Sequence, residues 1–193
     1  HPMHKKKEIR VLGIDDSPFE KGDEKVLVIG TFYRGGEALD GVMSTYCEVD
    51  GEDATYNLIQ MINASKFKSQ LQCLFLDGIA VGGFNIINIH SLHKHTGIPV
   101  IVVVRHMPDF QELEKTLQKL GMEKKYALME KAGPPKLVKT KQGQCYIQIA
   151  GMSWGEAEEF MKVCCTRSNI PEAIRAAHLI GAGIVKGESR GRA

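Results

Sequence analysis

Apolar positions in the first half of the chain form three short runs and then alternate with helical segments. The three runs span about residues 9–15, 25–32 and 42–49, and the turns between them are short enough for an antiparallel meander. From Asp53 to about residue 67 the apolar positions recur near every 3.6 residues, which predicts a helix with Asp53 as its N-cap. We expect further strands at 71–76 and 100–104 with a helix at 86–94 between them. The unbroken apolar run of the strand at 100–104 is typical of a parallel strand buried on both faces.

The second half of the chain is predicted to be mainly helical. Helices are expected at 109–120, 153–165 and 170–186, with one strand at 145–150 and a lysine-rich stretch around Gly133-Pro134-Pro135. Three strands, a helix, a strand, a helix and a strand in that order indicate an α/β fold of the ribonuclease-H-like kind. In this fold an antiparallel three-strand meander joins parallel strands in a mixed sheet flanked by helices.

The length of 193 residues favours a single domain over residues 1–193. Within it, residues 1–7 have the composition of a tag remnant and residues 187–193 form a basic tail. No apolar run approaches the roughly 20 residues of a membrane span, and no apolar stretch of a secretory signal follows the basic start. We therefore expect a cytoplasmic protein without a membrane partner. Five cysteines without a C-x-x-C pair agree with a reducing compartment.

Charge is distributed unevenly, although the net charge is only +2. Residues 11–60 hold eleven acidic and three basic side chains, whereas residues 119–141 hold seven lysines and two glutamates. Each segment is either a solvated face or part of a functional surface. For the basic segment and the tail with Lys186, Arg190 and Arg192, the function would be contact with a nucleic-acid backbone.

Three aspartates occupy positions that the predicted topology brings to one edge of the sheet. Asp15 ends the first strand, Asp77 ends the fourth, and Asp53 precedes the first helix. The carboxyl ends of parallel strands form ligand sites, and carboxylates that meet there repel one another unless a cation neutralises them. An all-oxygen cluster suits Mg²⁺ or Mn²⁺, so the pattern predicts metal-assisted hydrolysis of a phosphodiester. The structural alternatives are a turn at Asp15, a helix cap at Asp53 and a turn at Asp77.

A histidine in the last predicted helix is a further candidate. Pro171 stands at the start of that helix, and His178 shares a face with Ile174 and Ala182. On spacing alone His178 is a buried structural residue. Alternatively, His178 acts as a proton donor or acceptor, or contacts a phosphate, near neutral pH.

These motifs resemble those of endonuclease V, most closely its archaeal relatives of the UPF0215 type, also known as domain of unknown function 99. The resemblance runs in order from about residue 9 to 180 and implies a metal-dependent nuclease. Its segments are Gly13-Ile-Asp15-Asp-Ser17, Asp53-Ala-Thr, Leu74-Phe-Leu-Asp77-Gly78, Ile98-Pro-Val-Ile-Val-Val-Val-Arg105 and Ile170-Pro-Glu-Ala-Ile-Arg-Ala-Ala-His178.

The resemblance also implies roles for single residues. Asp15, Asp53 and Asp77 would bind Mg²⁺ or Mn²⁺ and would be catalytic together with His178. Arg105 would contact phosphate where endonuclease V has lysine. We assign substrate binding to Ser17, Asn85 and Arg105.

The chain departs from the endonuclease V pattern at three places. It lacks the P-Y-I-P wedge, and residues 79–85 lack the histidines and arginines that follow the D-G motif in that family. Asp53 is one carbon shorter than the family's glutamate, and Asp50 and Glu52 lie close enough to replace it.

The resulting prediction is a divalent-metal-dependent endonuclease of DNA repair that cuts DNA containing deaminated bases such as uracil or hypoxanthine. One alternative is a nucleic-acid-binding protein of the same fold that is non-catalytic or directed to RNA. The other is a small-molecule phosphohydrolase or nucleotide-binding enzyme, which is disfavoured because the chain has no complete glycine-rich phosphate-binding motif.

Overall fold

A computed structural model describes residues 8–190 and contains one seven-stranded mixed sheet. The expected tag remnant, residues 1–7, and the last three residues of the expected basic tail, 191–193, lie outside this described part. The strands of the sheet are β1 (Arg10–Asp16), β2 (Lys25–Arg34), β3 (Ala38–Glu48), β4 (Cys73–Asp77), β7 (Val100–Val104), β8 (Lys136–Thr140) and β9 (Gly143–Ala150). Their spatial order is β3-β2-β1-β4-β7-β9-β8. β1, β2 and β3 form the antiparallel meander, and β4 and β7 run parallel to β1, which confirms the predicted mixed α/β sheet.

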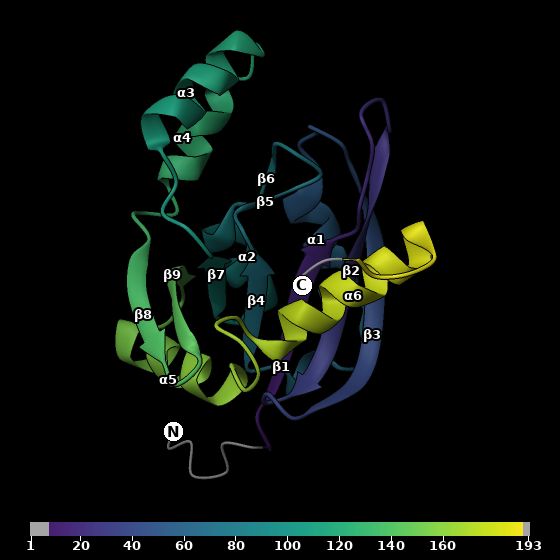
Figure 1. The fold of residues 1–193 in the computed structure, drawn as a ribbon, viewed down its shortest axis with the longest axis vertical. Coiled ribbons are helices and arrows are strands. Elements are labelled where there is room, and N and C mark those ends of the chain that lie inside the picture. The colour runs from purple at the N-terminus through teal and green to yellow at the C-terminus, as the bar shows by residue number, and fades with distance from the viewer. Residues whose placement is uncertain (1–7, 191–193) are drawn as a thin grey trace.

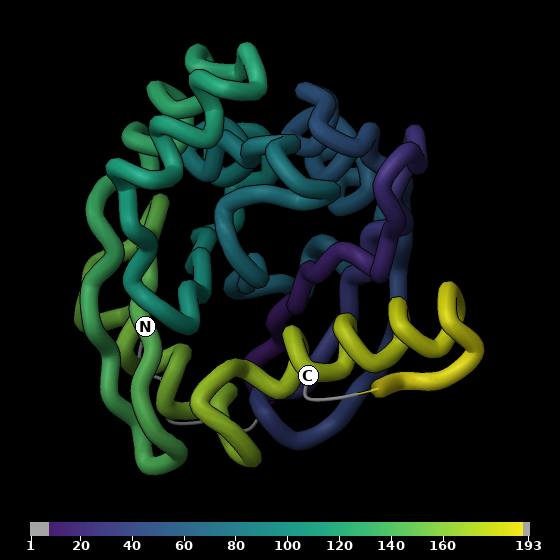
Figure 2. The backbone as a smooth tube through the Cα atoms, turned by 45° about the horizontal axis from the view of Figure 1, so that its top comes forward, coloured from purple at the N-terminus to yellow at the C-terminus, as the bar shows by residue number. Residues whose placement is uncertain are grey.

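Helices cover both faces of the sheet (Figure 1). One face carries α1 (Ala54–Asn63) and α2 (Ile89–Thr96), and the other carries α5 (Trp154–Cys164) and α6 (Glu172–Lys186). The remaining pair, α3 (Phe110–Lys119) and α4 (Lys124–Glu130), stands beyond the sheet as a projecting arm (Figures 1 and 2). A short 3₁₀ helix, η2 (Lys68–Gln70), and a small hairpin of β5 (Ala80–Val81) and β6 (Asn85–Ile86) complete the described elements. None of the helices within residues 8–190 is both long enough and apolar enough to cross a bilayer.

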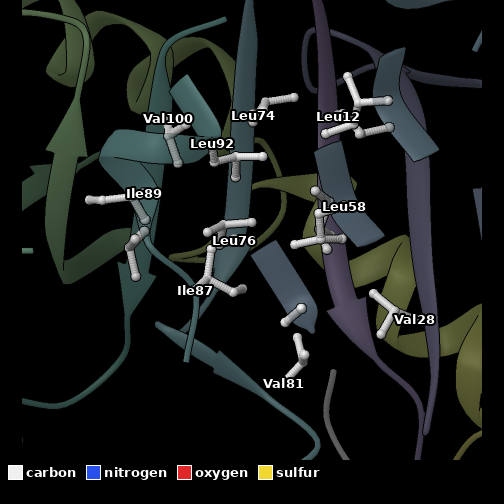
Figure 3. Close-up of a cluster of buried hydrophobic side chains, with 14 of the residues drawn as sticks. Leu12, Val28, Leu58, Leu74, Leu76, Val81, Ile87, Ile89, Leu92 and Val100 are labelled. Carbon is white, nitrogen blue, oxygen red and sulfur yellow. The ribbon is translucent and has the colours of Figure 1, made fainter. Parts of the chain in front are cut away.

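Alternation along the central strands divides the core into two layers. Side chains of successive strand residues point to opposite faces, so Leu12 of β1 and Leu74 of β4 pack against α1 and α2 (Figure 3). Their neighbours Val11 and Phe75 pack against α5 and α6. Because both faces are covered, these central strands consist almost entirely of buried apolar residues, as their sequences predict.

Helix α6 lies unusually close to β1 because a glycine faces it. A Cβ atom on Gly13 would collide with the backbone of Ala173. The buried Thr31 of β2 donates a hydrogen bond of 2.6 Å from Oγ1 to the carbonyl oxygen of Ala173. These contacts fix the start of α6 over the centre of the meander, and the helix then carries His178 to the end of β1.

Several elements differ from the sequence-based expectations, and α1 ends at residue 63 rather than at about 67. β3 begins at residue 38 rather than 42, and α2 begins at residue 89 rather than 86, because residues 85–86 pair with β5. α4, β8, η2 and the β5–β6 hairpin were not expected. Only Val138 of β8 is buried, so this strand has too few apolar positions to be recognised by alternation.

Candidate active site

Asp15 and Asp77 lie on the same face of the sheet at the ends of neighbouring parallel strands. Ile14 of β1 pairs with Leu76 of β4, so the next residues, Asp15 and Asp77, extend this register. Alternation places both on the α6 side, since Val11 and Phe75 point there. The same alternation along β7 places Arg105, the first residue after that strand, on this side too.

These side chains line a cavity of about 440 Å³ at the carboxyl ends of the strands. Its lining residues are Asp15, Asp16, Ser17, Pro18, Phe19, Asp77, Arg105 and His178. The cavity therefore brings together four of the predicted catalytic and phosphate-binding residues from β1, β4, the end of β7 and α6.

Electrostatics in the cavity are dominated by Asp15, which is only 5% exposed. Burial raises the pKa of Asp15, and the charges of Asp77 and Asp16 raise it further, to about 10. Asp15 Oδ2 lies 3.4 Å from Nδ1 of His178. Arg105 donates from Nη2 to Oδ2 of Asp77 at 3.2 Å. The lining of the cavity thus holds three aspartates and one guanidinium.

Asp16 is a member of the cavity that sequence reasoning did not single out. Its Oδ2 accepts a hydrogen bond of 2.7 Å from the backbone nitrogen of Gly82 in the turn between β5 and β6. Burial raises the pKa of Asp16, against the lowering effect of this hydrogen bond. The signal was present in the sequence as two adjacent acids at a strand end, but the motif assigned a role only to the first.

The structure places Asp53 outside this cavity. Asp53 precedes α1, which packs on the face of the sheet opposite α6. Its Oδ1 accepts hydrogen bonds from the backbone nitrogen of Glu48 at 3.0 Å and from Asn85 Nδ2 at 2.7 Å, and its Oδ2 accepts one from Asn57 Nδ2 at 3.0 Å. Partial burial raises the pKa of Asp53, but these hydrogen bonds prevail and hold it below its ordinary value. Asp53 therefore ties the end of β3 to α1 and β6.

Asn85 also lies away from the cavity, fully buried beside Asp53. Its Nδ2 donates to Asp53 and to the carbonyl oxygen of Glu48, and its Oδ1 accepts from the backbone nitrogen of Ala54. The amide is thus occupied by hydrogen bonds within the protein.

The two alternative acids near Asp53 are not in the cavity either. Asp50 Oδ1 accepts a hydrogen bond of 2.9 Å from the backbone nitrogen of Phe84. Glu52 lines a separate small pocket of about 160 Å³ next to Lys124 and Lys125.

Ser17 lines the cavity, and its hydroxyl group is buried against α6. The residue is 2% exposed, and its Oγ has no partner within residues 8–190. Gly181 of α6 packs against it, because a Cβ atom there would collide with Ser17. Since an unsatisfied buried hydroxyl is costly, this Oγ is suited to a polar group of a bound substrate.

The donor set fits a hard divalent cation. Mg²⁺ is usually bound by one or two carboxylates, with waters and substrate phosphate completing its shell. Asp15 and Asp77 supply two carboxylates in a cavity whose acids oppose one another's ionisation. Within the described chain no three Asp, Glu, His or Cys side chains are grouped as a ready-made metal site. Asp15 and Asp77 would therefore supply only part of the coordination shell of a divalent cation, and water and substrate phosphate would complete it.

Comparison with known proteins identifies the family. The profile of the endonuclease dU family matches residues 7–185, and the chain belongs to this family. A UPF0215 protein of Methanothermobacter thermautotrophicus is 46% identical over 191 residues, covering 97% of this chain and 93% of the relative. This confirms the resemblance to the archaeal branch of endonuclease V-like proteins.

Solved structures with similar folds agree. A protein of unknown function from Archaeoglobus fulgidus is 38% identical with a TM-score of 0.83, covering 92% of this chain and 99% of its own. Endonuclease V of Ciona intestinalis, solved with a 24-mer DNA containing an inosine followed by a ribo-adenosine, has a TM-score of 0.57 at 16% identity, covering 89% and 83%. The fold is therefore that of endonuclease V and ribonuclease-H-like, and family and fold together support a nuclease of this type.

Proposed function

We propose that this protein is a divalent-metal-dependent endonuclease that hydrolyses a backbone phosphodiester in DNA containing deaminated bases, with uracil or hypoxanthine as the candidate lesions. The observation that carries the proposal is the pairing of Asp15 and Asp77 in one cavity. Arg105 and His178 line the same cavity from two further elements. Acids and a guanidinium at strand ends, together with an imidazole from α6, suit phosphoryl chemistry.

The substrate class is supported by the family. Its description, endonuclease dU, points to deoxyuridine, and the similar endonuclease V of Ciona intestinalis was solved with inosine-containing DNA. Uracil and hypoxanthine are both products of base deamination. A role in DNA repair follows if this chain acts on such lesions.

Asp15 and Asp77 would hold the cation, which supplies positive charge to the phosphoryl group and lowers the pKa of water. Arg105 is placed to bind a non-bridging phosphate oxygen, since its guanidinium has further donors besides the one given to Asp77. Ser17 Oγ would donate to another substrate oxygen and so gain the partner that it lacks within the described chain. His178 Nδ1, close to Asp15, is placed to take or return a proton during hydrolysis.

Asp53 and Asn85 have a supporting role in this proposal. They hold the β3 end, α1 and the β5–β6 hairpin together through hydrogen bonds of their own. Gly82 in that hairpin in turn binds Asp16. Loss of Asp53 would therefore act on the cavity indirectly.

The experiment compares cleavage of duplexes that contain one deoxyuridine, one deoxyinosine or only normal bases, with Mg²⁺, with Mn²⁺ and with EDTA. We expect cleavage of the modified duplexes only when a divalent cation is present. Asp77→Asn should lower the rate at least 100-fold, because it removes a charged ligand and the partner of Arg105. Glu24→Gln, which removes one negative charge at an exposed position outside the cavity, is the matched control and should cleave like wild type.

Cleavage by Asp77→Asn at the wild-type rate would overturn the assignment of the cavity as the active site. Salt-sensitive binding of nucleic acid without cleavage under any of these conditions would favour the non-catalytic alternative. Parallel assays on RNA strands of the same sequence separate a DNA-directed from an RNA-directed enzyme.

A further inference from the structure

A second cavity, of about 620 Å³, lies outside the candidate active site, between the β8–β9 hairpin and the end of α5. Its lining residues are Lys139, Thr140, Lys141, Gln142, Glu159, Lys162, Val163, Cys165 and Thr166. Three lysines and one glutamate give this lining a net charge of +2. The polar remainder consists of two threonines and a glutamine, which are hydrogen-bonding side chains.

We call this second cavity the lysine cavity, and its three lysines, like most lysines within residues 8–190, form no ion pair there. Lys139, Lys141 and Lys162 form no ion pair with any residue between positions 8 and 190. By contrast, Lys186 lies 3.7 Å from Glu20, and Arg190 lies 3.5 Å from Glu188. The basic charge of the tail is therefore already compensated in part, whereas that of the lysine cavity is available to an external anion.

Hydrogen bonds hold the walls of the lysine cavity in place. Asn169 Nδ2 donates to the carbonyl oxygen of Gln144 at 2.9 Å, which ties the loop after α5 to the hairpin. Thr166 Oγ1 donates to the carbonyl oxygen of Gly36 at 2.7 Å, which ties the same loop to the turn between β2 and β3. The cavity is thus formed by several elements that are far apart in the sequence.

The hairpin is connected to the active site through the sheet. Val104, the last residue of β7, pairs with Tyr146 of β9. Arg105 follows directly in the chain, and β9 continues past this point to Gly143, where it turns into β8. Since Val104 pairs with Tyr146, the next residue, Arg105, continues this register beside Cys145 of the hairpin. The Arg105 charge accordingly acts against burial, which raises the pKa of the Cys145 thiol to about 11.

We propose that the lysine cavity binds backbone phosphates of the nucleic-acid substrate beside the bond to be cleaved, as a site separate from the catalytic cavity. A nucleic-acid backbone fits this cavity, because its phosphates repeat at short intervals. A DNA or RNA strand with one phosphate bound by Arg105 would therefore offer further phosphates to the three lysines. Contacts of this kind position a substrate without reading its sequence. The inference rests on the proposed function, since it requires a nucleic-acid substrate.

The test uses the whole protein with Lys139, Lys141 and Lys162 each replaced by Gln. The probe is a fluorescein-labelled duplex of about 30 base pairs with one central deoxyuridine, and anisotropy is measured in EDTA between about 50 and 200 mM salt. We expect Kd to rise roughly tenfold or more, and the slope of log Kd against log salt to become shallower by about 2 to 3. The ratio of affinities for modified and unmodified duplexes should stay the same, because phosphate contacts carry no base information. In the Mn²⁺ cleavage assay KM should rise by the same factor with kcat unchanged.

Two further variants guard against a merely structural effect. Replacement of the same three lysines by arginine keeps the charge and should restore the wild-type Kd and salt slope. Replacement of Lys66, Lys68 and Lys94 by Gln removes the same charge from around α1 and α2 and should leave both values near wild type.

A wild-type Kd and salt slope in the triple glutamine variant would overturn the lysine cavity as a substrate site while leaving the nuclease proposal intact. If the wild-type protein binds DNA but does not cleave it, and the triple glutamine variant shows the expected rise in Kd and shallower salt slope, the nuclease proposal fails. The lysine cavity then remains a nucleic-acid site. If the wild-type protein binds neither DNA nor RNA, both proposals fail together.

Discussion

Asp15→Asn should stabilise the metal-free protein at neutral pH, although it removes a proposed catalytic residue. In the fold, burial and then the charges of Asp77 and Asp16 raise the pKa of Asp15 from 3.8 to about 10. The unfolded chain has no such environment, so its Asp15 ionises freely. Asparagine has nearly the same shape and never ionises, and it therefore avoids this cost.

The sign and the size follow from proton linkage. Between about pH 4 and pH 10 the native state keeps a proton on Asp15 that the unfolded state loses, so the free energy of unfolding falls as pH rises. Each pKa unit corresponds to about 1.36 kcal/mol, which sets an upper limit of about 4 kcal/mol on the difference at pH 7. Below about pH 4 Asp15 is protonated in both states and the difference disappears.

The assay is urea unfolding in EDTA at several pH values between about 5 and 8, with wild type, Asp15→Asn and Glu24→Gln. We expect Asp15→Asn to gain stability over wild type, by an amount that grows with pH, and Glu24→Gln to stay within about 0.5 kcal/mol of wild type. Equal or lower stability of Asp15→Asn at pH 8 would refute the claim that the fold opposes the charge of Asp15.

Repeating the series with Mn²⁺ tests the metal assignment separately. A ligand at 100 times its Kd stabilises a native protein by about 2.7 kcal/mol. Wild type should gain this stability, because the cation neutralises the carboxylates, whereas Asp15→Asn should gain little. Equal gains in the two proteins would place the cation elsewhere.

Three further substitutions test other parts of the structure. Asp53→Ala should lower the free energy of unfolding by about 2 kcal/mol through the loss of charge-assisted hydrogen bonds. This contribution should vanish in urea unfolding as pH falls through the lowered pKa of Asp53, since the protonated carboxyl group accepts such bonds weakly. Arg105→Ala should raise KM about tenfold in the cleavage assay, because the phosphate loses a bidentate donor; an unchanged KM would remove Arg105 from the substrate site. Gly13→Ala should cost about 1–3 kcal/mol in urea unfolding, because its methyl group meets the Ala173 backbone; a neutral effect would mean that α6 can shift freely on β1.

Parts of the candidate site were predictable because strand alternation and motif order are properties of the sequence. Asp15, Asp77 and Arg105 each stand at or just after the end of an apolar run, and parallel pairing brings such ends together. His178 was predictable from its helix and from the resemblance to endonuclease V, but spacing alone favoured a buried structural histidine.

Asp53 and Asn85 show where the sequence was insufficient. The side of the sheet on which a helix N-terminus lies depends on the path of the loop before it, and short-range patterns do not encode this path. Asp53 precedes a helix on the face opposite α6 and finds its partners in Glu48, Asn57 and Asn85. Asp16, which the motif left without a role, lies in the cavity instead.

The sequence by itself determined the order of the elements, the mixed sheet and the strand ends that carry acids, because these follow from local apolar periodicity and turn residues. Tertiary structure alone decided which carboxyl groups share a cavity, which of them already have hydrogen-bond partners, and where three lysines gather around a second cavity. Burial, pKa and the pairing of charges arise from distances between residues remote in the chain, and those distances exist only once the sheet is assembled and α6 has packed against Gly13.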